Sequence, residues 1–264
     1  MKVRFITSEI FVGKRCGGFD ELVYVDPYTR RYGFGPFGIY HLIEGLLPRI
    51  ADLTICVSYE LADNARSFGA RKIEVIPNGF EPDIFLAKKK TQRKTKDVIL
   101  GIKKEKKVVL YVGQIGRTLG MDIFIKSAAF VPDDVIFILV GSGPGLREVK
   151  LLVDKLGLGE KIRFLGPKPR EEIPEFINLS DICVCPHSVE SSIKLTEYGA
   201  LGKPVLALKG PIERSFLKDK EIVVSEWDPK EFASLIKHLL NDKRKSLSIG
   251  KRLQKKVLRD YRWD

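Results

Sequence analysis

The sequence has few of the residues that staple small proteins together. Its 264 residues include only four cysteines and three histidines. The cysteines form no Cys-x-x-Cys pair, and no histidine lies at zinc-ligand spacing from a cysteine pair. Small secreted scaffolds are therefore excluded, and we expect no metal site. Cys183 and Cys185 are two residues apart in an apolar run, which predicts that both lie buried on one face of a strand.

Long apolar runs are also missing. No stretch approaches the roughly 18 residues of a membrane-spanning helix, and residues 1–7 are too short and too charged for a signal peptide. We therefore expect a protein of a reducing cytoplasm. Hydrophobic residues make up 44% and charged residues 30% of the chain, so a disordered tail is excluded as well. The length suggests one large or two modest domains.

Negative charge is scarce relative to positive charge, with a formal net charge of +12. Basic residues are densest in residues 88–107 and 243–262, which favour a phosphate-bearing partner or an anionic surface. Two interpretations remain open: a solvated lysine-rich surface, and peripheral attachment to the anionic inner face of a membrane. The usual nucleic-acid signatures are absent, so we expect no nucleic-acid partner.

Short apolar runs alternate with helical patterns along the chain. Strands are predicted at 3–7, 53–57, 72–76, 107–112, 135–140, 162–165, 182–185, 204–207 and 222–224. Helices are predicted at 37–49, 59–68, 121–130, 146–156, 170–178, 194–201, 229–240 and 243–259. This alternation indicates an α/β protein with a doubly wound parallel sheet. The predicted organisation is a short N-terminal α/β unit at 1–87, a basic linker at 88–106 and a larger domain at 107–264.

Three glycine- or serine-rich loops follow predicted strands of the larger domain. They span residues 113–120, 141–145 and 186–192. Because doubly wound sheets bind ligands beyond the carboxyl ends of their strands, we expect the loops to lie at one edge. Glycines let backbone N–H groups approach an anion, and a helix N-terminus adds a positive dipole end. Together they favour a nucleotide-type ligand, although each alone is also compatible with ordinary turns.

Glu197 lies too far inside the helix at 194–201 to act as a cap. Apolar neighbours suggest that its carboxylate is partly buried and faces the ligand edge, where it could accept hydrogen bonds from a ribose diol. The alternative is an exposed helix glutamate that pairs with Lys194 or Lys203.

The ordered motifs of the chain resemble the retaining nucleotide-sugar glycosyltransferases of family 4, the glycogen synthase-like enzymes with a two-domain GT-B fold. The similarity covers roughly residues 51–241. The motifs are Val75-Ile-Pro-Asn-Gly-Phe-Glu-Pro-Asp-Ile-Phe85, Tyr111-Val-Gly113, Leu139-Val-Gly-Ser-Gly-Pro144, Phe164-Leu-Gly166, Ser180-Asp-Ile182 and Glu197-Tyr198 with Gly202-Lys-Pro-Val205. The resemblance implies a GT-B-like fold whose N-terminal domain is shortened.

The resemblance also implies roles for individual residues. Glu197 would bind the donor ribose, the backbone N–H groups of Ser192 and Ile193 would hold the diphosphate, and the loop at 167–169 would border the nucleobase. No metal or other cofactor is implied, because loop dipoles and cations stabilise the departing diphosphate. The candidate catalytic residues are Glu190, Lys194 and Arg117. The candidate donor-binding residues are Gly113, Gln114, Gly141, Ser142, Gly143, Lys168, Pro169, Ser191, Ser192, Ile193 and Glu197, and a glycine loop is expected at Gly17 and Gly18.

Two function hypotheses follow from these residues. The first is a transferase that moves a sugar from a nucleoside-diphosphate-sugar to an acceptor with retention of anomeric configuration. The second is a donor-binding or vestigial subunit that is inactive alone, with a second chain or a second copy completing the acceptor site. Gln114 and Leu119 stand where the family usually has arginine and lysine, which favours weak transfer by the isolated chain.

Overall fold

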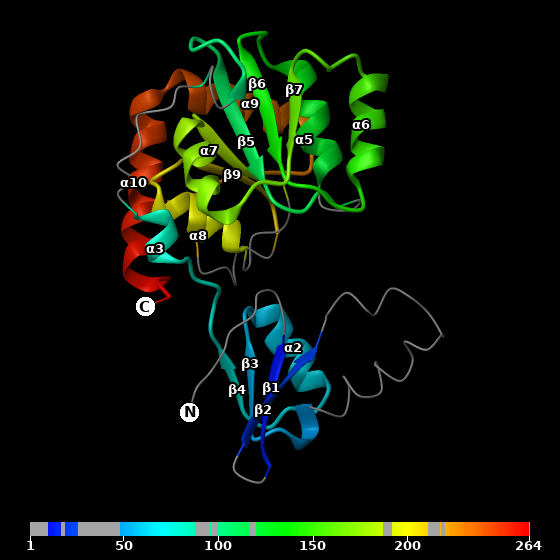
Figure 1. The fold of residues 1–264 in the computed structure, drawn as a ribbon, viewed down its shortest axis with the longest axis vertical. Coiled ribbons are helices and arrows are strands. Elements are labelled where there is room, and N and C mark those ends of the chain that lie inside the picture. Colours follow the sequence, from blue (N-terminus) through cyan, green and yellow to red (C-terminus); the bar gives the residue numbers. More distant parts are fainter. Residues whose placement is uncertain are drawn as a thin grey trace. The chain divides into compact units, whose positions relative to one another are not determined.

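A computed structural model describes residues 10–16, 19–25, 48–87, 96, 100–116, 120–186, 192–210, 217 and 220–263. The chain divides into two compact units whose boundary lies between Asn78 and Gly79 (Figure 1). This boundary is earlier than the predicted one at residue 87. The physical reason is that Glu81 pairs with Arg170 and Phe80 pairs with Arg262, so the segment after Gly79 belongs to the second unit.

The first unit contains a mixed sheet with the strand order β2-β1-β3-β4. Its strands are β1 (Ile10–Cys16), β2 (Phe19–Val25), β3 (Leu53–Cys56) and β4 (Ile73–Val75). β3 and β4 are parallel, whereas β1 pairs antiparallel with both β2 and β3. Helix α2 (Tyr59–Ser67) connects β3 to β4 and buries Ala62 and Ala65.

The β1–β2 hairpin was not predicted from the sequence. We expected an opening parallel strand at 3–7 followed by a glycine loop at Gly17 and Gly18. All of these residues lie outside the described part of the chain. Cys16 pairs directly with Phe19, so β1 and β2 form an antiparallel hairpin.

The second unit contains a six-stranded, fully parallel sheet with the order β10-β9-β8-β5-β6-β7. Its strands are β5 (Lys107–Val112), β6 (Val135–Val140), β7 (Ile162–Gly166), β8 (Ile182–Cys185), β9 (Val205–Leu208) and β10 (Val223–Ser225). The bounds predicted for β5, β6 and β8 are confirmed. Their continuous apolar sequences are those of strands covered on both faces.

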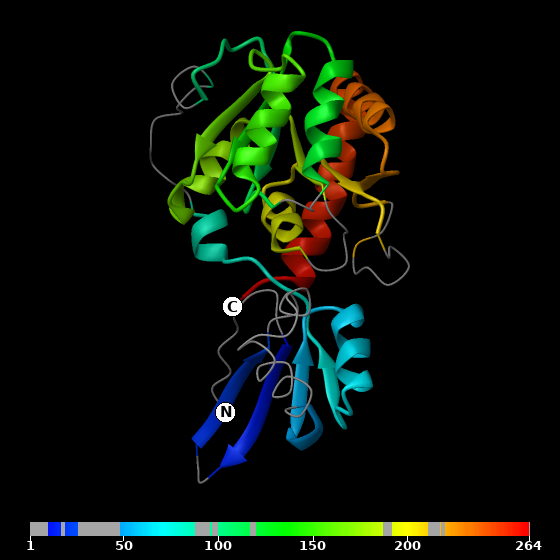
Figure 2. The same cartoon turned by 90° about the vertical axis from the view of Figure 1, so that its right-hand side faces the viewer.

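Helices cover both faces of this sheet (Figure 2). They are α3 (Pro82–Phe85), α5 (Met121–Ser127), α6 (Leu146–Lys155), α7 (Ile173–Leu179), α8 (Ile193–Ala200), α9 (Pro229–Asn241) and α10 (Lys243–Asp260). Alternate residues of β5 and β6 form the main core with α5, α6 and α9. On the other face, α8 presents Gly199 to Leu253 and Val257 of α10.

The segment after Gly79 is fixed to the end of the chain. Phe80 N–H donates to the carbonyl of Tyr261 at 2.9 Å, and Trp263 N–H donates to the carbonyl of Phe80 at 3.1 Å. A Cβ on Gly79 would lie 2.7 Å from the Tyr261 carbonyl oxygen, which is too close for any other residue. The second unit is thus closed by segments from its two ends. Among the described residues, no helix is long and apolar enough to cross a membrane.

Candidate functional site

The loops that follow β5, β6 and β7 are hydrogen-bonded to one another at the carboxyl edge of the six-stranded sheet. Gly113 N–H donates to the Val140 carbonyl, and Ile115 N–H donates to the Ser142 carbonyl, both at 2.9 Å. Gly141 N–H donates to the Gly166 carbonyl at 2.8 Å. These bonds confirm that the loops after β5 and β6 lie together at one edge, as the sequence predicts, whereas most of the third predicted loop, at 186–192, lies outside the described residues.

Glycine is required in these loops because backbone lies against backbone. A Cβ on Gly141, whose φ is +131°, would lie 2.0 Å from the carbonyl oxygen of Gly113. A Cβ on Gly113 would lie 2.3 Å from Cε of Lys194, so the lysine stem from α8 passes directly over this loop. The Lys194 ammonium lies 5.6 Å from the centre of the Tyr111 ring. The loop after β5 and the first turn of α8 therefore form one surface.

Helix α8 begins next to these loops and is tied to β5 by its tyrosine. Ser192 is the N-cap residue, and Ile193 is the first helical residue. The hydroxyl of Tyr198 accepts a hydrogen bond from Val112 N–H at 2.9 Å, and both groups are buried. This bond fixes the register of α8 against the end of β5, and with it the position of the α8 N-terminus.

Glu197 lies one turn inside α8 and is 4% exposed. Arg170, which follows the loop after β7, places its Nη1 2.8 Å from Oε1 of Glu197. The two groups are close enough for an ion pair, but the guanidinium N–H is not aligned for a hydrogen bond. This buried oxygen therefore has no aligned donor among the described residues. The prediction that Glu197 is buried is confirmed, and the alternative of an exposed glutamate paired with Lys194 or Lys203 is wrong. Lys203 instead donates to the carbonyls of Asn178 and Ser180.

Arg170 connects three elements of the second unit. Besides Glu197, it pairs with Glu81, and its guanidinium lies 5.4 Å from the ring centre of Phe85. The sequence analysis missed this residue, although Glu81 stands inside one of its quoted motifs and Arg170 directly follows Lys168 and Pro169. Distance in the sequence explains the omission, because Lys194 and Lys203 lie within six residues of Glu197 and Arg170 lies 27 residues before it.

The electrostatics of Glu197 are dominated by burial. Loss of solvent raises the pKa of its carboxyl above the usual range, whereas the charges of Arg170 and Lys194 lower it in part. A buried carboxylate oxygen without a hydrogen-bond donor raises the free energy of the folded state. A ligand hydroxyl that donates to it would relieve that cost.

The remaining candidate residues lie either in loops that the structure describes or outside the described residues. Gln114, Ser142 and Gly143 lie in the hydrogen-bonded loops, and Lys168 and Pro169 lie in the exposed loop that leads to Arg170. Three candidates lie outside the described residues: Arg117, Glu190 and Ser191. Within the ranges that the structure describes, no group of three or more His, Cys, Asp or Glu residues could hold a metal ion.

Comparisons with known proteins show which family this chain resembles. The family model described as "Glycosyl transferases group 1" matches residues 92–256. The D-inositol 3-phosphate glycosyltransferase of Corynebacterium urealyticum is 28% identical over 229 residues, which cover 80% of this chain and 53% of that protein. The alpha-D-kanosaminyltransferase of Streptomyces kanamyceticus is 28% identical over 144 residues, which cover 52% of this chain and 37% of that protein.

Solved structures show the same fold. HepE of Anabaena in complex with UDP and glucose has a TM-score of 0.72 at 22% identity, and the match covers 81% of this chain and 60% of that one. Sucrose-phosphate synthase of Thermosynechococcus elongatus has a TM-score of 0.73 at 21% identity, and the match covers 89% and 61%. The predicted GT-B-like α/β fold is thereby confirmed. The chain spans about half the length of the first curated relative.

Proposed function

Because this chain belongs to the group 1 glycosyl transferases, we propose that it binds a nucleoside-diphosphate-sugar at the carboxyl edge of its six-stranded sheet and transfers the sugar to an acceptor. Retention of anomeric configuration is part of the proposal, as the resemblance to family 4 implies. No cofactor is proposed, and the nucleoside-diphosphate-sugar is the substrate.

The observation that carries the proposal is the buried carboxylate of Glu197. Its Oε1 lacks an aligned donor, and it lies on the same helix whose first turn borders the glycine loops. A ribose diol offers two O–H donors, and a carboxylate accepts two such bonds well. The ion pair with Arg170 favours the ionised form of the carboxyl and holds it in place, so the residue is positioned to accept hydrogen bonds from a ligand.

The diphosphate has a matching position one turn earlier. The N–H groups of Ser192 and Ile193 face out of the N-terminus of α8, where the helix dipole favours negative charge. Lys194 crosses the loop after β5 and brings a cation to the same surface. When the bond between the sugar and the diphosphate breaks, negative charge grows on the leaving oxygen, and these groups would stabilise it.

The proposal includes a surface for attachment to anionic membranes. Helix α10 buries one face and exposes basic side chains on the other, at Lys251, Lys255 and Arg259 among others. Each basic residue near an anionic surface contributes about 1 kcal/mol of attraction. Flotation with anionic vesicles tests this part independently of donor binding.

The alternative to a transferase that acts alone is a donor-binding subunit whose acceptor site is completed by a second copy or another chain. Product formation by the purified monomer with an acceptor panel separates these two functions.

Calorimetric titration with UDP, GDP and ADP, and with their sugars, tests the donor site. We expect Glu197→Gln to weaken binding of the preferred nucleotide ten- to hundredfold, the range for losing hydrogen bonds to a charged group. The substitution keeps the shape of the side chain and removes the charge, so the fold is preserved. Glu160→Gln, at an exposed turn, is the matched control and should bind as the wild type does. Unchanged affinity in Glu197→Gln would remove the residue from the site.

A further inference from the structure

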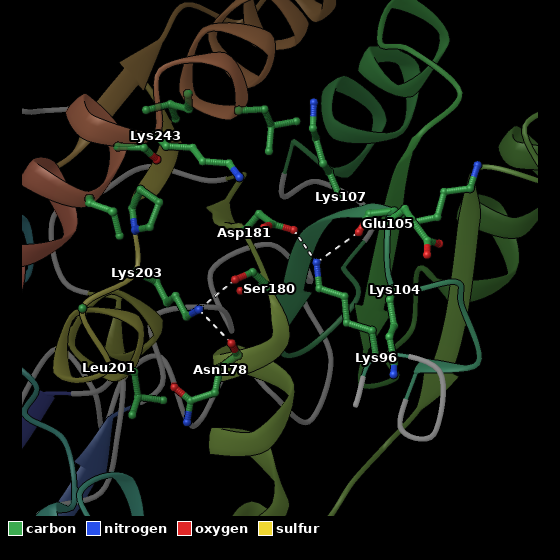
Figure 3. A pocket seen from close by; sticks show the side chains of 17 residues that line it. Lys96, Lys104, Glu105, Lys107, Asn178, Ser180, Asp181, Leu201, Lys203 and Lys243 are labelled. Carbon is green, nitrogen blue, oxygen red and sulfur yellow. Dashed lines mark hydrogen bonds and ion pairs between the residues drawn. The ribbon is translucent and has the colours of Figure 1, made fainter. Parts of the chain in front are cut away.

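A cavity lies at the edge of the six-stranded sheet opposite to the glycine loops. It has a volume of about 520 Å³ and is bordered by the first residues of β5, the residues before β8 and β9, and the junction of α9 with α10 (Figure 3). β5 has six residues, so at ~3.3 Å per residue the two edges are roughly 20 Å apart. The cavity is therefore separate from the proposed donor site.

Lysine dominates the lining of this cavity. Six lysines and two acidic residues border it: Lys96, Lys104, Lys106, Lys107, Lys203 and Lys243, with Glu105 and Asp181. Two of the lysines are engaged elsewhere, since Lys106 donates to the Asp133 carbonyl and Lys107 pairs with Asp134. The other four lysines outnumber the two acidic residues, so the cavity lining has an excess of positive charge.

Lys96, Lys203 and Lys243 come from segments far apart in the sequence, and all three line this cavity (Figure 3). Lys96 pairs with Asp181 at 2.8 Å, and the same carboxylate oxygen also accepts from Val108 N–H at 2.7 Å. Lys203 donates only to backbone carbonyls, which carry no neutralising charge. Lys243 has no ion-pair or hydrogen-bond partner among the described residues. Of these three lysines, only Lys96 therefore has a carboxylate partner, and that carboxylate oxygen already accepts a second hydrogen bond.

Burial makes this imbalance costly. Loss of solvent lowers the pKa of Lys203, and the charge of Lys96 acts in the same direction, while Cys183 and Asp181 oppose these effects only in part. A bound anion would reverse the effect by supplying the missing negative charge. The lysines therefore have an energetic reason to recruit a ligand.

We propose that this cavity binds a phosphate monoester dianion between Lys96, Lys203 and Lys243. Such a group carries a charge of about −1.5 to −2 at neutral pH and offers three acceptor oxygens, which suits three lysine donors and the unbalanced charge. The volume lies within the range of small-molecule sites, about 300–1,000 Å³, so there is room for the organic part of the ester as well. The ester is either a free phosphorylated metabolite or the headgroup of a lipid.

The test is a titration of the whole chain with glycerol 3-phosphate, and in parallel with phosphatidylcholine vesicles with and without phosphatidic acid. These two probes present the same monoester, free or in a lipid. We expect Lys243→Glu to weaken binding at least tenfold, because a charge-assisted contact is replaced by repulsion. The variant should fold normally, since glutamate is favourable in the first turn of α10.

Lys237→Glu, on the exposed face of α9, makes the same change in net charge outside the cavity and should alter affinity less than threefold. Anion binding at the glycine loops contributes equally to both variants, so their difference isolates the cavity. Binding of glycerol 3-phosphate identifies a free metabolite as the source, and binding of phosphatidic acid vesicles alone identifies a lipid. Equal losses in both variants, no loss in either, or no binding of either probe by the wild type would overturn the proposal.

Discussion

Replacing Arg170 by methionine removes the cation that accompanies the buried carboxylate of Glu197. Methionine keeps most of the volume of the side chain, so the change acts mainly on charge. Breaking a fully buried ion pair by removing one partner costs about 3–5 kcal/mol, because the remaining charge is left without compensation. Here 39% of the Arg170 side chain is exposed, against 5% for Glu197. Water can therefore compensate in part, and we expect a loss of about 2–3 kcal/mol in the free energy of unfolding.

The pH dependence gives this prediction a second, independent readout. Burial already raises the pKa of Glu197, and without Arg170 the main opposing influence is gone. A carboxyl whose pKa is higher in the folded than in the unfolded state destabilises the fold as the pH rises through that interval. The loss caused by Arg170→Met should thus be greatest at neutral pH and should shrink as the pH falls toward about 4.3, the usual pKa of glutamate.

Urea denaturation at neutral pH and at about pH 5 measures both effects. Lys126→Met serves as the control, because Lys126 forms an exposed ion pair with Asp122 at 3.0 Å. Such pairs contribute about 0.3–0.5 kcal/mol. If Arg170→Met loses no more stability than Lys126→Met, or if its loss is the same at both pH values, the account of a buried carboxylate held by Arg170 is refuted.

Three further predictions concern the parts that hold the site. Gly141→Ala should lower the free energy of unfolding by about 2–4 kcal/mol, because its Cβ would overlap the neighbouring loop. The control is Gly159→Ala, whose Cβ meets nothing within 4 Å and should be tolerated, and chemical denaturation compares the two variants. Tyr198→Phe should cost about 1–3 kcal/mol by leaving the buried Val112 N–H without an acceptor, and faster hydrogen exchange at that amide would report the loss. Asp228→Ala removes the side-chain cap of α9 and should cost about 1 kcal/mol in a thermal melt, and an unchanged melting temperature would argue against the cap.

Much of the second unit could be predicted because its strands are short, continuous apolar runs. β5 and β6 are buried on both faces, so hydrophobicity alone marks their limits. The clustering of the glycine loops also followed from general topology, since the carboxyl ends of parallel strands meet at one edge. The burial of Glu197 could be predicted from its apolar neighbours on the helix.

The partner of Glu197 could not be predicted in the same way. Arg170 lies on a different element, and nothing local distinguishes it from the many other basic residues of the chain. The β1–β2 hairpin was missed for another reason. Two glycines between two runs of strand-forming residues are compatible with a hairpin turn or with a ligand-binding loop, and the choice depends on pairing with β3, which is a tertiary contact.

The pairing of Phe80 with Arg262 has a consequence for how the protein is made. The bonds that join Phe80 to Tyr261 and Trp263 connect the first and last segments of the second unit. During synthesis the ribosome releases Phe80 long before its partners exist, so this closure must wait until nearly the whole unit has been translated. Until then the contacts of Glu81 and Phe85 with Arg170 help to hold this segment on the growing sheet. A truncated gene intended to express this unit should accordingly start at Gly79, since one that starts at Lys107 would omit the strand partner of the C-terminus.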